Sequence, residues 1–219
     1  MAGHEGGGAD LTSTTINTDF VRWTIVRETI RTYASKLHEL IVQIASKLAG
    51  SLGLVGYSFE DWPSQFRINK YHFAEETVGS SGVQIHTDSG FLTVLQEDES
   101  VGGLEVMTES GSFIPVNPVP GSFLVNLGDV AKAWSNGRLH NVKHRVQCKK
   151  AAQRFSIALF LLAPKNDIVE PPPALVDSEH PRLYKTFTYH EYRKLRFSSG
   201  SHAGEALSSL AQHPANVEA

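Results

Sequence analysis

The chain has 219 residues, a formal net charge of −3 at pH 7, 41% hydrophobic residues and 20% charged residues. This length allows one domain with a substantial core, and the weak negative charge without a long basic run excludes the usual nucleic-acid-binding classes. The single cysteine, Cys148, excludes an internal disulfide framework, and with neither a membrane-length apolar stretch nor a signal-peptide pattern we expect a cytoplasmic protein without a membrane partner.

The N-terminal part of the chain combines a polar tail with one amphipathic segment. Residues 1–20 are rich in Gly, Ser, Thr and Asn, so we expect a disordered tail. From Trp23 to Leu52, apolar residues recur at spacings of three and four, which predicts a helix that ends near Gly50 or Gly53. The apolar stripe comprises Val26, Ile30, Tyr33, Leu37, Leu40, Ile41, Ile44 and Leu48. We expect this stripe to cover the outer face of a sheet.

The middle of the chain has the pattern of a β-protein. Between Gln65 and Ala163, short apolar runs alternate with turns rich in Gly, Pro, Ser and Asn. The expected strands are residues 66–73, 91–96, 103–107, 112–116, 122–127, 139–147 and 154–162. Because no helical spacers separate these strands, the pattern favours a mainly β sandwich or jelly roll with flanking helices over a parallel doubly wound sheet.

Beyond Pro164 the chain becomes irregular, with short helical patterns near residues 189–196 and 203–211. We therefore divide the chain into four parts. They are a disordered tail (1–20), a helical segment (21–61), a mainly β core (62–166) and a C-terminal extension (167–219).

Three residues of the expected core have the side chains and spacing of a metal site. His86 and Asp88 are two residues apart, so in an extended strand both point to the same face, and His144 supplies a second imidazole from a later strand. Two imidazoles and one carboxylate can bind non-haem iron(II) and leave other positions open, whereas closed zinc sites have four ligands, commonly including Cys. An isolated H-x-D pair is more often a surface or hydrogen-bonded pair, so this prediction depends on its partners.

Arg154 and Ser156 lie two residues apart on an otherwise apolar strand, and so on one face of it. A buried guanidinium needs an anionic partner and can grip a carboxylate through two N–H groups, to which the Ser156 hydroxyl can add a third donor. This pattern predicts a pocket for a dicarboxylate. The alternative is a salt bridge from Arg154 to an internal carboxylate such as Asp129.

Tyr71 shares one strand face with Arg67 and Asn69. A tyrosine hydroxyl in this position can complete the carboxylate pocket. The alternative is that Tyr71 packs in the core with its hydroxyl at the rim.

Several motifs together resemble the plant-type 2-oxoglutarate- and iron(II)-dependent dioxygenases. They are HTDSGFLTVL from His86, GGLEV from Gly102, NLGD from Asn126, SNGR from Ser135, HRV from His144 and RFS from Arg154. The resemblance covers about residues 25–210 and implies a double-stranded β-helix core. It implies that His86, Asp88 and His144 bind Fe(II). It also implies that Arg154, Ser156 and Tyr71 bind 2-oxoglutarate, with ascorbate as reductant.

Other segments look most like the members of this family that oxidise auxin. They are VGSSGVQ from Val78, AWSNG from Ala133, FLLAPK from Phe160 and DSEHPRLYK from Asp177. This resemblance implies a small-molecule substrate, an auxin-like carboxylic acid. Such enzymes convert indole-3-acetic acid to 2-oxindole-3-acetic acid.

The chain departs from the family at its N-terminus. Family members usually carry an N-terminal domain before the helix, and residues 1–20 match none of it. We therefore expect a chain that lacks most of that domain and has exposed sheet edges. Two other functions remain open, namely a truncated, inactive metal- or ligand-binding jelly roll and a cupin-type protein with another divalent metal.

Overall fold

The computed structural model describes residues 18–200 and 202–212. The contacts divide the chain into a small unit that ends at Ser35 and a larger unit that begins at Lys36. Most of the expected disordered tail, residues 1–17, lies outside the described residues. Within the described part of the chain, no helix is both long and apolar enough to cross a membrane.

Helix α1 (Thr18–Ser51) crosses the boundary between the two units. Its most buried positions in the larger unit are Leu37, Ile41, Ala45 and Ala49. These residues recur at every fourth position and therefore lie on one side of the helix. Gly53, with a φ of 83°, follows the end of the helix in the left-handed conformation that terminates many helices.

Two residues of the predicted apolar stripe are exposed in the small unit, so the stripe is not buried along its whole length. Val26 and Ile30 are 41% and 37% exposed, although their spacing placed them on the covered face. Amphipathic spacing predicts which side of a helix is apolar, but burial also requires a neighbouring layer, which the spacing does not supply.

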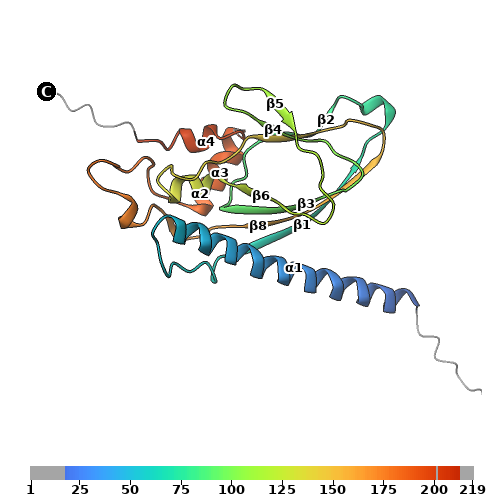
Figure 1. Ribbon diagram of the computed structural model, residues 1–219, viewed down its shortest axis with the longest axis horizontal. Coiled ribbons are helices and arrows are strands. Elements are labelled where there is room, and N and C mark those ends of the chain that lie inside the picture. Colours follow the sequence, from blue (N-terminus) through green and yellow to red (C-terminus); the bar gives the residue numbers. More distant parts are fainter. Residues whose placement is uncertain (1–17, 201, 213–219) are drawn as a thin grey trace, which may run out of the picture. The chain divides into compact units, whose positions relative to one another are not determined.

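Eight strands form two antiparallel sheets with the orders β1-β8-β3-β6 and β2-β7-β4-β5 (Figure 1). Their bounds are β1 (Ser64–His72), β2 (Ser81–His86), β3 (Leu92–Glu97), β4 (Leu104–Met107), β5 (Phe113–Pro115), β6 (Leu124–Leu127), β7 (His144–Gln147) and β8 (Gln153–Leu161). Strands from β2 onward repeatedly change sheets along the chain, as a double-stranded β-helix requires. The predicted mainly β jelly-roll fold is thus confirmed.

Smaller elements complete the chain. They are η1 (Glu75–Thr77), α2 (Asp129–Trp134), β9 (Ile168–Val169), η2 (Pro173–Leu175), β10 (Phe187–Thr188), α3 (Tyr189–Ser199) and α4 (Glu205–Ser208). Helix α3 begins with a capping box, in which the Glu191 N–H donates to Thr188 Oγ1 and the Thr188 N–H donates to the Glu191 carboxylate. Both short C-terminal helices were predicted from their periodicity, whereas α2 was not predicted.

Strand β2 was not among the predicted strands, because Ser80, Ser81 and Gly82 suggest a turn. In the structure Gly82 lies inside the strand, and a Cβ at this position would come within 2.9 Å of the Phe73 ring. The glycine therefore allows two aromatic rings, Tyr71 and Phe73, to pack closely against the strand. Residue type alone does not distinguish this role from that of a turn glycine.

The predicted strand at residues 139–147 is too long, since β7 begins only at His144. Upstream of it, the Leu139 N–H donates to Ser135 Oγ and the Asn141 amide donates to Asp129 Oδ1. These contacts connect the segment to α2 rather than to a neighbouring strand.

The core lies between the two sheets, and β8 shows how it is built. Arg154, Ser156 and Ala158 alternate with more exposed residues and point inward. An aromatic cluster fills one end of the core, where the Phe91 ring centroid lies 4.7 Å from Phe59 and 5.2 Å from Trp134. This packing supports the turn that precedes β3, which carries part of the candidate site.

Candidate metal centre and carboxylate pocket

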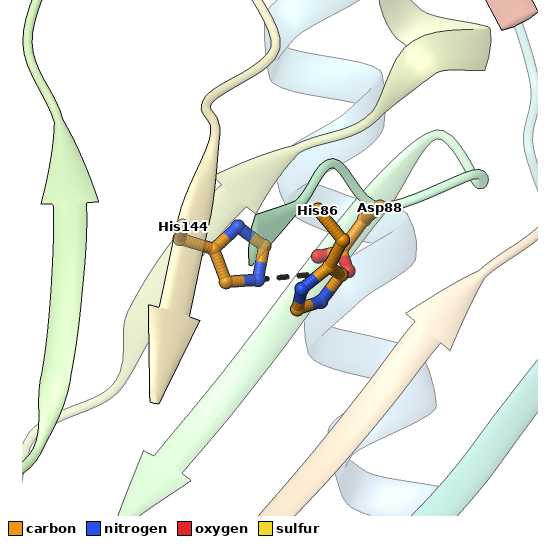
Figure 2. A group of neighbouring side chains, drawn as sticks. All are labelled: His86, Asp88 and His144. Atoms are coloured by element: carbon orange, nitrogen blue, oxygen red, sulfur yellow. Dashed lines mark ion pairs between the residues drawn. The ribbon is translucent and has the colours of Figure 1, made fainter. Parts of the chain in front are cut away.

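The structure brings His86, Asp88 and His144 together inside the barrel (Figure 2). His86 is the last residue of β2 and His144 the first residue of β7, and the strand register places them opposite each other. Their ring centroids lie 4.2 Å apart. The Nε2 atoms of His86 and His144 lie 3.7 Å and 3.8 Å from Asp88 Oδ1.

Asp88 reaches this position by a route that differs from the predicted one. Strand β2 ends at His86, and Asp88 lies in the turn that follows. The ladder stops because the Thr87 N–H donates to the His202 carbonyl (2.8 Å) instead of a neighbouring strand. Asp88 thus lies beyond the strand, and its carboxylate meets the imidazoles while the intervening Thr87 hydroxyl donates to Asp129.

Hydrogen bonds orient the ligand atoms. Nδ1 of His86 lies 2.9 Å from the Gln84 carbonyl and Nδ1 of His144 lies 3.2 Å from the Val142 carbonyl. Because a carbonyl can only accept, each Nδ1 carries the proton and each Nε2 keeps a free lone pair. The Thr93 hydroxyl donates to Asp88 Oδ2 (2.6 Å), which leaves Oδ1 facing the two imidazoles.

The donor set fits a divalent metal ion. The three ligand atoms lie within 4.8 Å of one another, and in the described part of the chain no other group of three His, Cys, Asp or Glu residues shares this property. Burial, followed by the neighbouring His144, lowers the pKa of His86, which favours the neutral imidazole that a metal requires. Two imidazoles and one carboxylate on a single face match the donor set of non-haem iron(II) proteins.

Arg154 and Ser156 lie on the neighbouring inner surface of the same barrel, and both are buried. Strands β1 and β8 pair so that Tyr71 lies opposite Arg154 and Asn69 lies opposite Ser156. The Tyr71 ring centroid is 5.0 Å from the Arg154 guanidinium carbon, and the Asn69 amide donates to Ser156 Oγ (3.2 Å). Tyr71 thus contacts the guanidinium through its ring.

The internal partner of Arg154 is Glu97, at the end of β3, and not Asp129 as one alternative suggested. Arg154 Nη2 donates to Glu97 Oε1, whereas Nε and Nη1 are buried without a hydrogen-bond partner. Two unsatisfied donor nitrogens on a buried guanidinium carry a substantial desolvation cost, which a bound carboxylate would reduce. Burial raises the pKa of the Glu97 carboxyl, against the opposite effect of Arg154.

A cavity of about 100 Å³ connects the two groups of residues. All six predicted site residues line it, namely Tyr71, His86, Asp88, His144, Arg154 and Ser156. Arg67 and Phe160 also line this cavity, with the Arg67 guanidinium carbon 5.6 Å from the Phe160 ring centroid. The arrangement offers a metal-binding face and an anion-binding guanidinium to one small ligand.

Two residues of the site, Thr93 and Glu97, were not among the predicted site residues. Thr93 lies within the predicted strand, but that strand ended at Gln96, one residue before Glu97. Inward alternation along β3 from Thr93 through Leu95 leads to Glu97, so a strand longer by one residue would have placed Glu97 on the same face as Thr93.

Comparison with known proteins assigns the chain to a family. Residues 62–163 match the 2OG-Fe(II) oxygenase superfamily. The chain is 65% identical over 187 residues to the 2-oxoglutarate-dependent dioxygenase DAO of Oryza sativa subsp. indica, a match that covers 85% of this chain and 62% of that protein.

Two solved structures are similar. The crystal structure of the dioxygenase for auxin oxidation (DAO) in rice superimposes with a TM-score of 0.83 at 64% identity, covering 85% of this chain and 64% of that one. The complex of the Arabidopsis thaliana dioxygenase for auxin oxidation 1 with 2-oxoglutarate has a TM-score of 0.69 at 60% identity, covering 71% and 59%. The chain thus spans less than two thirds of the length of these relatives. The fold, the matched motifs and these similarities show that residues 62–163 form a domain of the 2OG-Fe(II) oxygenase superfamily.

Proposed function

We propose that the chain is an Fe(II)- and 2-oxoglutarate-dependent dioxygenase that oxidises indole-3-acetic acid to 2-oxindole-3-acetic acid. The observation that carries this proposal is the cavity shared by three oriented metal ligands and by a buried guanidinium with two unused donor nitrogens. The relatives described above, whose names specify auxin oxidation, support the choice of substrate.

In this proposal His86, Asp88 and His144 hold the iron ion, which supplies oxygen activation when it is bound. Arg154 contributes Nη1, which has no partner within the protein, to the distal carboxylate of 2-oxoglutarate, and Ser156 contributes its hydroxyl. Tyr71 covers the guanidinium with its ring, so that solvent is kept from the ion pair. The residues 62–166 act as the catalytic core, with residues 21–61 and 167–219 as flanking segments.

Arg67 is a second arginine that lines the cavity, and its positive charge favours an acidic substrate. Arg67 lies on the same face of β1 as Tyr71, but it is exposed, whereas Arg154 is buried. A partly solvated guanidinium beside the Phe160 ring can bind a carboxylate attached to an aromatic system through charge and stacking. An indole ring with a short acid side chain has these two features.

The test is a turnover assay with indole-3-acetic acid, Fe(II), 2-oxoglutarate and ascorbate, followed by mass analysis of the products. We expect substrate-dependent succinate and a product heavier by one oxygen atom. The control is Asp88→Ala, which removes the only anionic metal ligand and should abolish both metal binding and succinate formation. Wild-type chain that binds Fe(II) but consumes no 2-oxoglutarate would contradict the proposal and favour a ligand-binding jelly roll.

A further inference from the structure

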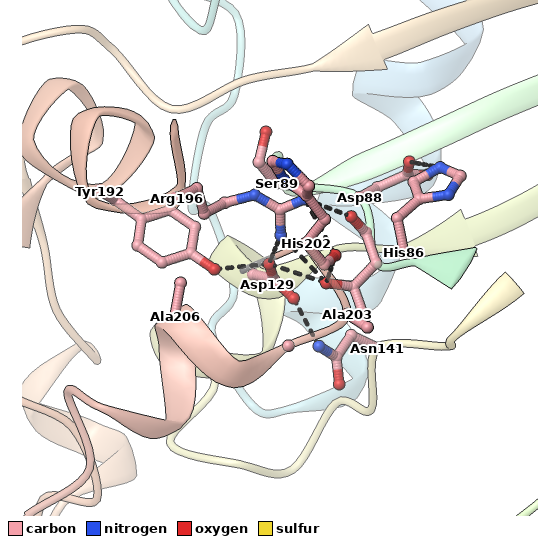
Figure 3. Close-up of polar contacts among 12 residues, drawn as sticks. His86, Asp88, Ser89, Asp129, Asn141, Tyr192, Arg196, His202, Ala203 and Ala206 are labelled. Carbon is pink, nitrogen blue, oxygen red and sulfur yellow. Dashed lines mark hydrogen bonds and ion pairs between the residues drawn. The ribbon is translucent and has the colours of Figure 1, made fainter. Parts of the chain in front are cut away.

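A largely buried polar network lies next to His86 and Asp88 (Figure 3). It consists of Thr87, Asp129, Asn141, Tyr192 and Arg196, and is called the Asp129 network below. Asp129 is fully buried, and its carboxylate is saturated by four donors. Oδ2 accepts from Arg196 (2.6 Å), Tyr192 (2.5 Å) and Thr87 (3.0 Å), and Oδ1 accepts from Asn141 (2.5 Å).

The Asp129 network binds the turn that carries the metal ligands. Thr87 stands between His86 and Asp88, and all three of its polar groups have partners: the hydroxyl donates to Asp129, the carbonyl accepts from Arg196 Nη2 (2.9 Å), and the N–H donates to the His202 carbonyl (2.8 Å). Every polar group of Thr87 therefore has a partner, and these contacts together hold the residue in one position.

The backbone of the turn is held in the same way. The Asp129 N–H donates to the Asp88 carbonyl (2.8 Å). Gly128 lies so close that a Cβ there would meet the Gly90 carbonyl oxygen at 2.2 Å and the Asp88 carbonyl oxygen at 2.8 Å. The start of α2 is thus in direct contact with the turn that carries a metal ligand.

We propose that Asp129 and Arg196, acting through Thr87, are positioning residues that set the geometry and affinity of the metal site. This inference rests on the proposed function, since it assumes that His86, Asp88 and His144 bind a metal. Arg196 comes from α3, so the C-terminal extension is part of the metal-binding machinery although none of its side chains is a ligand. Partners behind metal ligands typically change metal affinity by about 10- to 100-fold when they are removed.

The chemistry of the network fits this role better than a purely stabilising one. Two buried, oppositely charged groups are commonly no more stabilising than apolar residues of the same volume. What a saturated carboxylate provides is one defined geometry. Burial and Asp129 both raise the pKa of Tyr192, so its hydroxyl remains a donor.

The test measures metal affinity separately from stability, with cobalt(II) as the probe under anaerobic conditions. Cobalt(II) reports both its dissociation constant and, through its visible absorption, the geometry of its ligands. Thr87→Val keeps the shape of the side chain but removes the hydroxyl, and we expect about a 10-fold loss of cobalt(II) affinity with an altered spectrum. Thr87→Ser retains the hydroxyl and should restore both.

Two further variants address the other end of the network. Arg196→Lys keeps the charge but cannot contact Asp129 and the Thr87 carbonyl together, and should weaken cobalt(II) at least as much as Thr87→Val. Tyr192→Phe removes one hydroxyl from Asp129 and should have a smaller effect of the same sign.

Tyr57→Phe is the matched control. It also deletes one tyrosine hydroxyl from a partly buried hydrogen bond, the one that Trp134 Nε1 donates (3.1 Å), and that bond involves neither a metal ligand nor a member of the Asp129 network. We expect a lower melting temperature with unchanged cobalt(II) affinity and spectrum. If Thr87→Val and Arg196→Lys bind cobalt(II) as wild type does, or if Tyr57→Phe weakens it equally, the positioning role is wrong. If wild-type protein binds no more cobalt(II) than Asp88→Ala, the proposed function fails together with it.

Discussion

Arg154 and Arg196 are each paired with a buried carboxylate, but the two pairs are completed in different ways. Arg196 reaches four acceptors with Nη1 and Nη2, namely Asp129 Oδ2, Thr87 Oγ1 and the carbonyls of Thr87 and His202. Arg154 reaches only Glu97, and its Nε and Nη1 have no partner. The side chains of Arg154 and Arg196 are 1% and 11% exposed, so unused donors are costly in either place.

This contrast indicates that the Asp129–Arg196 pair is structural and that the Arg154–Glu97 pair belongs to a binding site. A saturated network has one favourable arrangement and holds the chain in it, as around Asp129. A buried guanidinium with two spare donors facing a cavity is incomplete by itself and becomes complete with a ligand. Hydrogen-bond saturation therefore separates two roles that burial and charge alone would not distinguish.

Breaking the Asp129–Arg196 pair should have the largest effect on folding. Asp129→Asn leaves the Arg196 guanidinium beside a neutral amide, and we expect the free energy of unfolding to fall by about 3 kcal/mol, as for other broken buried ion pairs. Chemical denaturation followed by fluorescence measures this loss. A change as small as that of an exposed salt bridge, under about 1 kcal/mol, would show that the network contributes little.

A change in the Arg154–Glu97 pair should instead affect ligand binding. Arg154→Lys should weaken 2-oxoglutarate by about 10-fold to 100-fold, because an ammonium cannot reproduce the planar guanidinium that donates to Glu97 and to the ligand together, and a hydrogen bond to a charged group contributes about 1.5–3 kcal/mol. Anaerobic titration with Fe(II) present measures the affinity. Arg67→Lys, in the same cavity, is the control and should leave 2-oxoglutarate affinity unchanged; equal losses would show that Arg154 has no special role.

The stability that Glu97 contributes to the folded protein should depend on pH. Because burial raises the pKa of Glu97 in the folded state, the folded protein binds this proton more tightly than the unfolded chain does. The stability that Glu97 contributes is therefore complete below its ordinary pKa, about 4.3, and is lost as the pH rises through the raised value. Glu97→Gln cannot titrate, so wild type should lose unfolding free energy relative to Glu97→Gln across this window. Parallel curves for the two proteins would refute the assignment.

Tyr71 should give the smallest effect. Tyr71→Phe keeps the ring over the Arg154 guanidinium and removes only the hydroxyl, so we expect a decrease in 2-oxoglutarate affinity of about 1 kcal/mol or less. Tyr71→Ala removes the ring as well and should weaken binding more. Titration of both variants separates the contribution of the hydroxyl from that of the ring, and equal affinities for both variants would assign the whole contribution to the hydroxyl.

Local patterns in the sequence were enough to predict most of the barrel. Alternating apolar residues and turn signals predicted β1, β3, β4, β5, β6 and β8, with ends that differ from the structure by a few residues. The inward face of β8 follows from alternation alone, which places Arg154 and Ser156 side by side. Patterns of this kind are reliable because they depend on a residue and its immediate neighbours.

The errors occurred where a residue responds to a distant part of the chain. Gly82 lies in a strand because the Phe73 ring needs the space, and β2 ends at His86 because Thr87 binds the carbonyl of His202. The pairing of Arg154 with Glu97 and of Arg196 with Asp129 could not be predicted for the same reason, because the sequence offers several acidic residues to each arginine.

The residue types of the site, the period of the strands and the resemblance to a dioxygenase family can all be read from short stretches of the sequence. The position of Asp88 beyond the end of β2, the pairing of Glu97 with Arg154 and the contact of Arg196 with Thr87 became visible only in the folded protein. Side-chain chemistry and alternation are local properties, whereas the choice among buried partners depends on which surfaces fold against each other and on the cost of leaving any polar group without a partner.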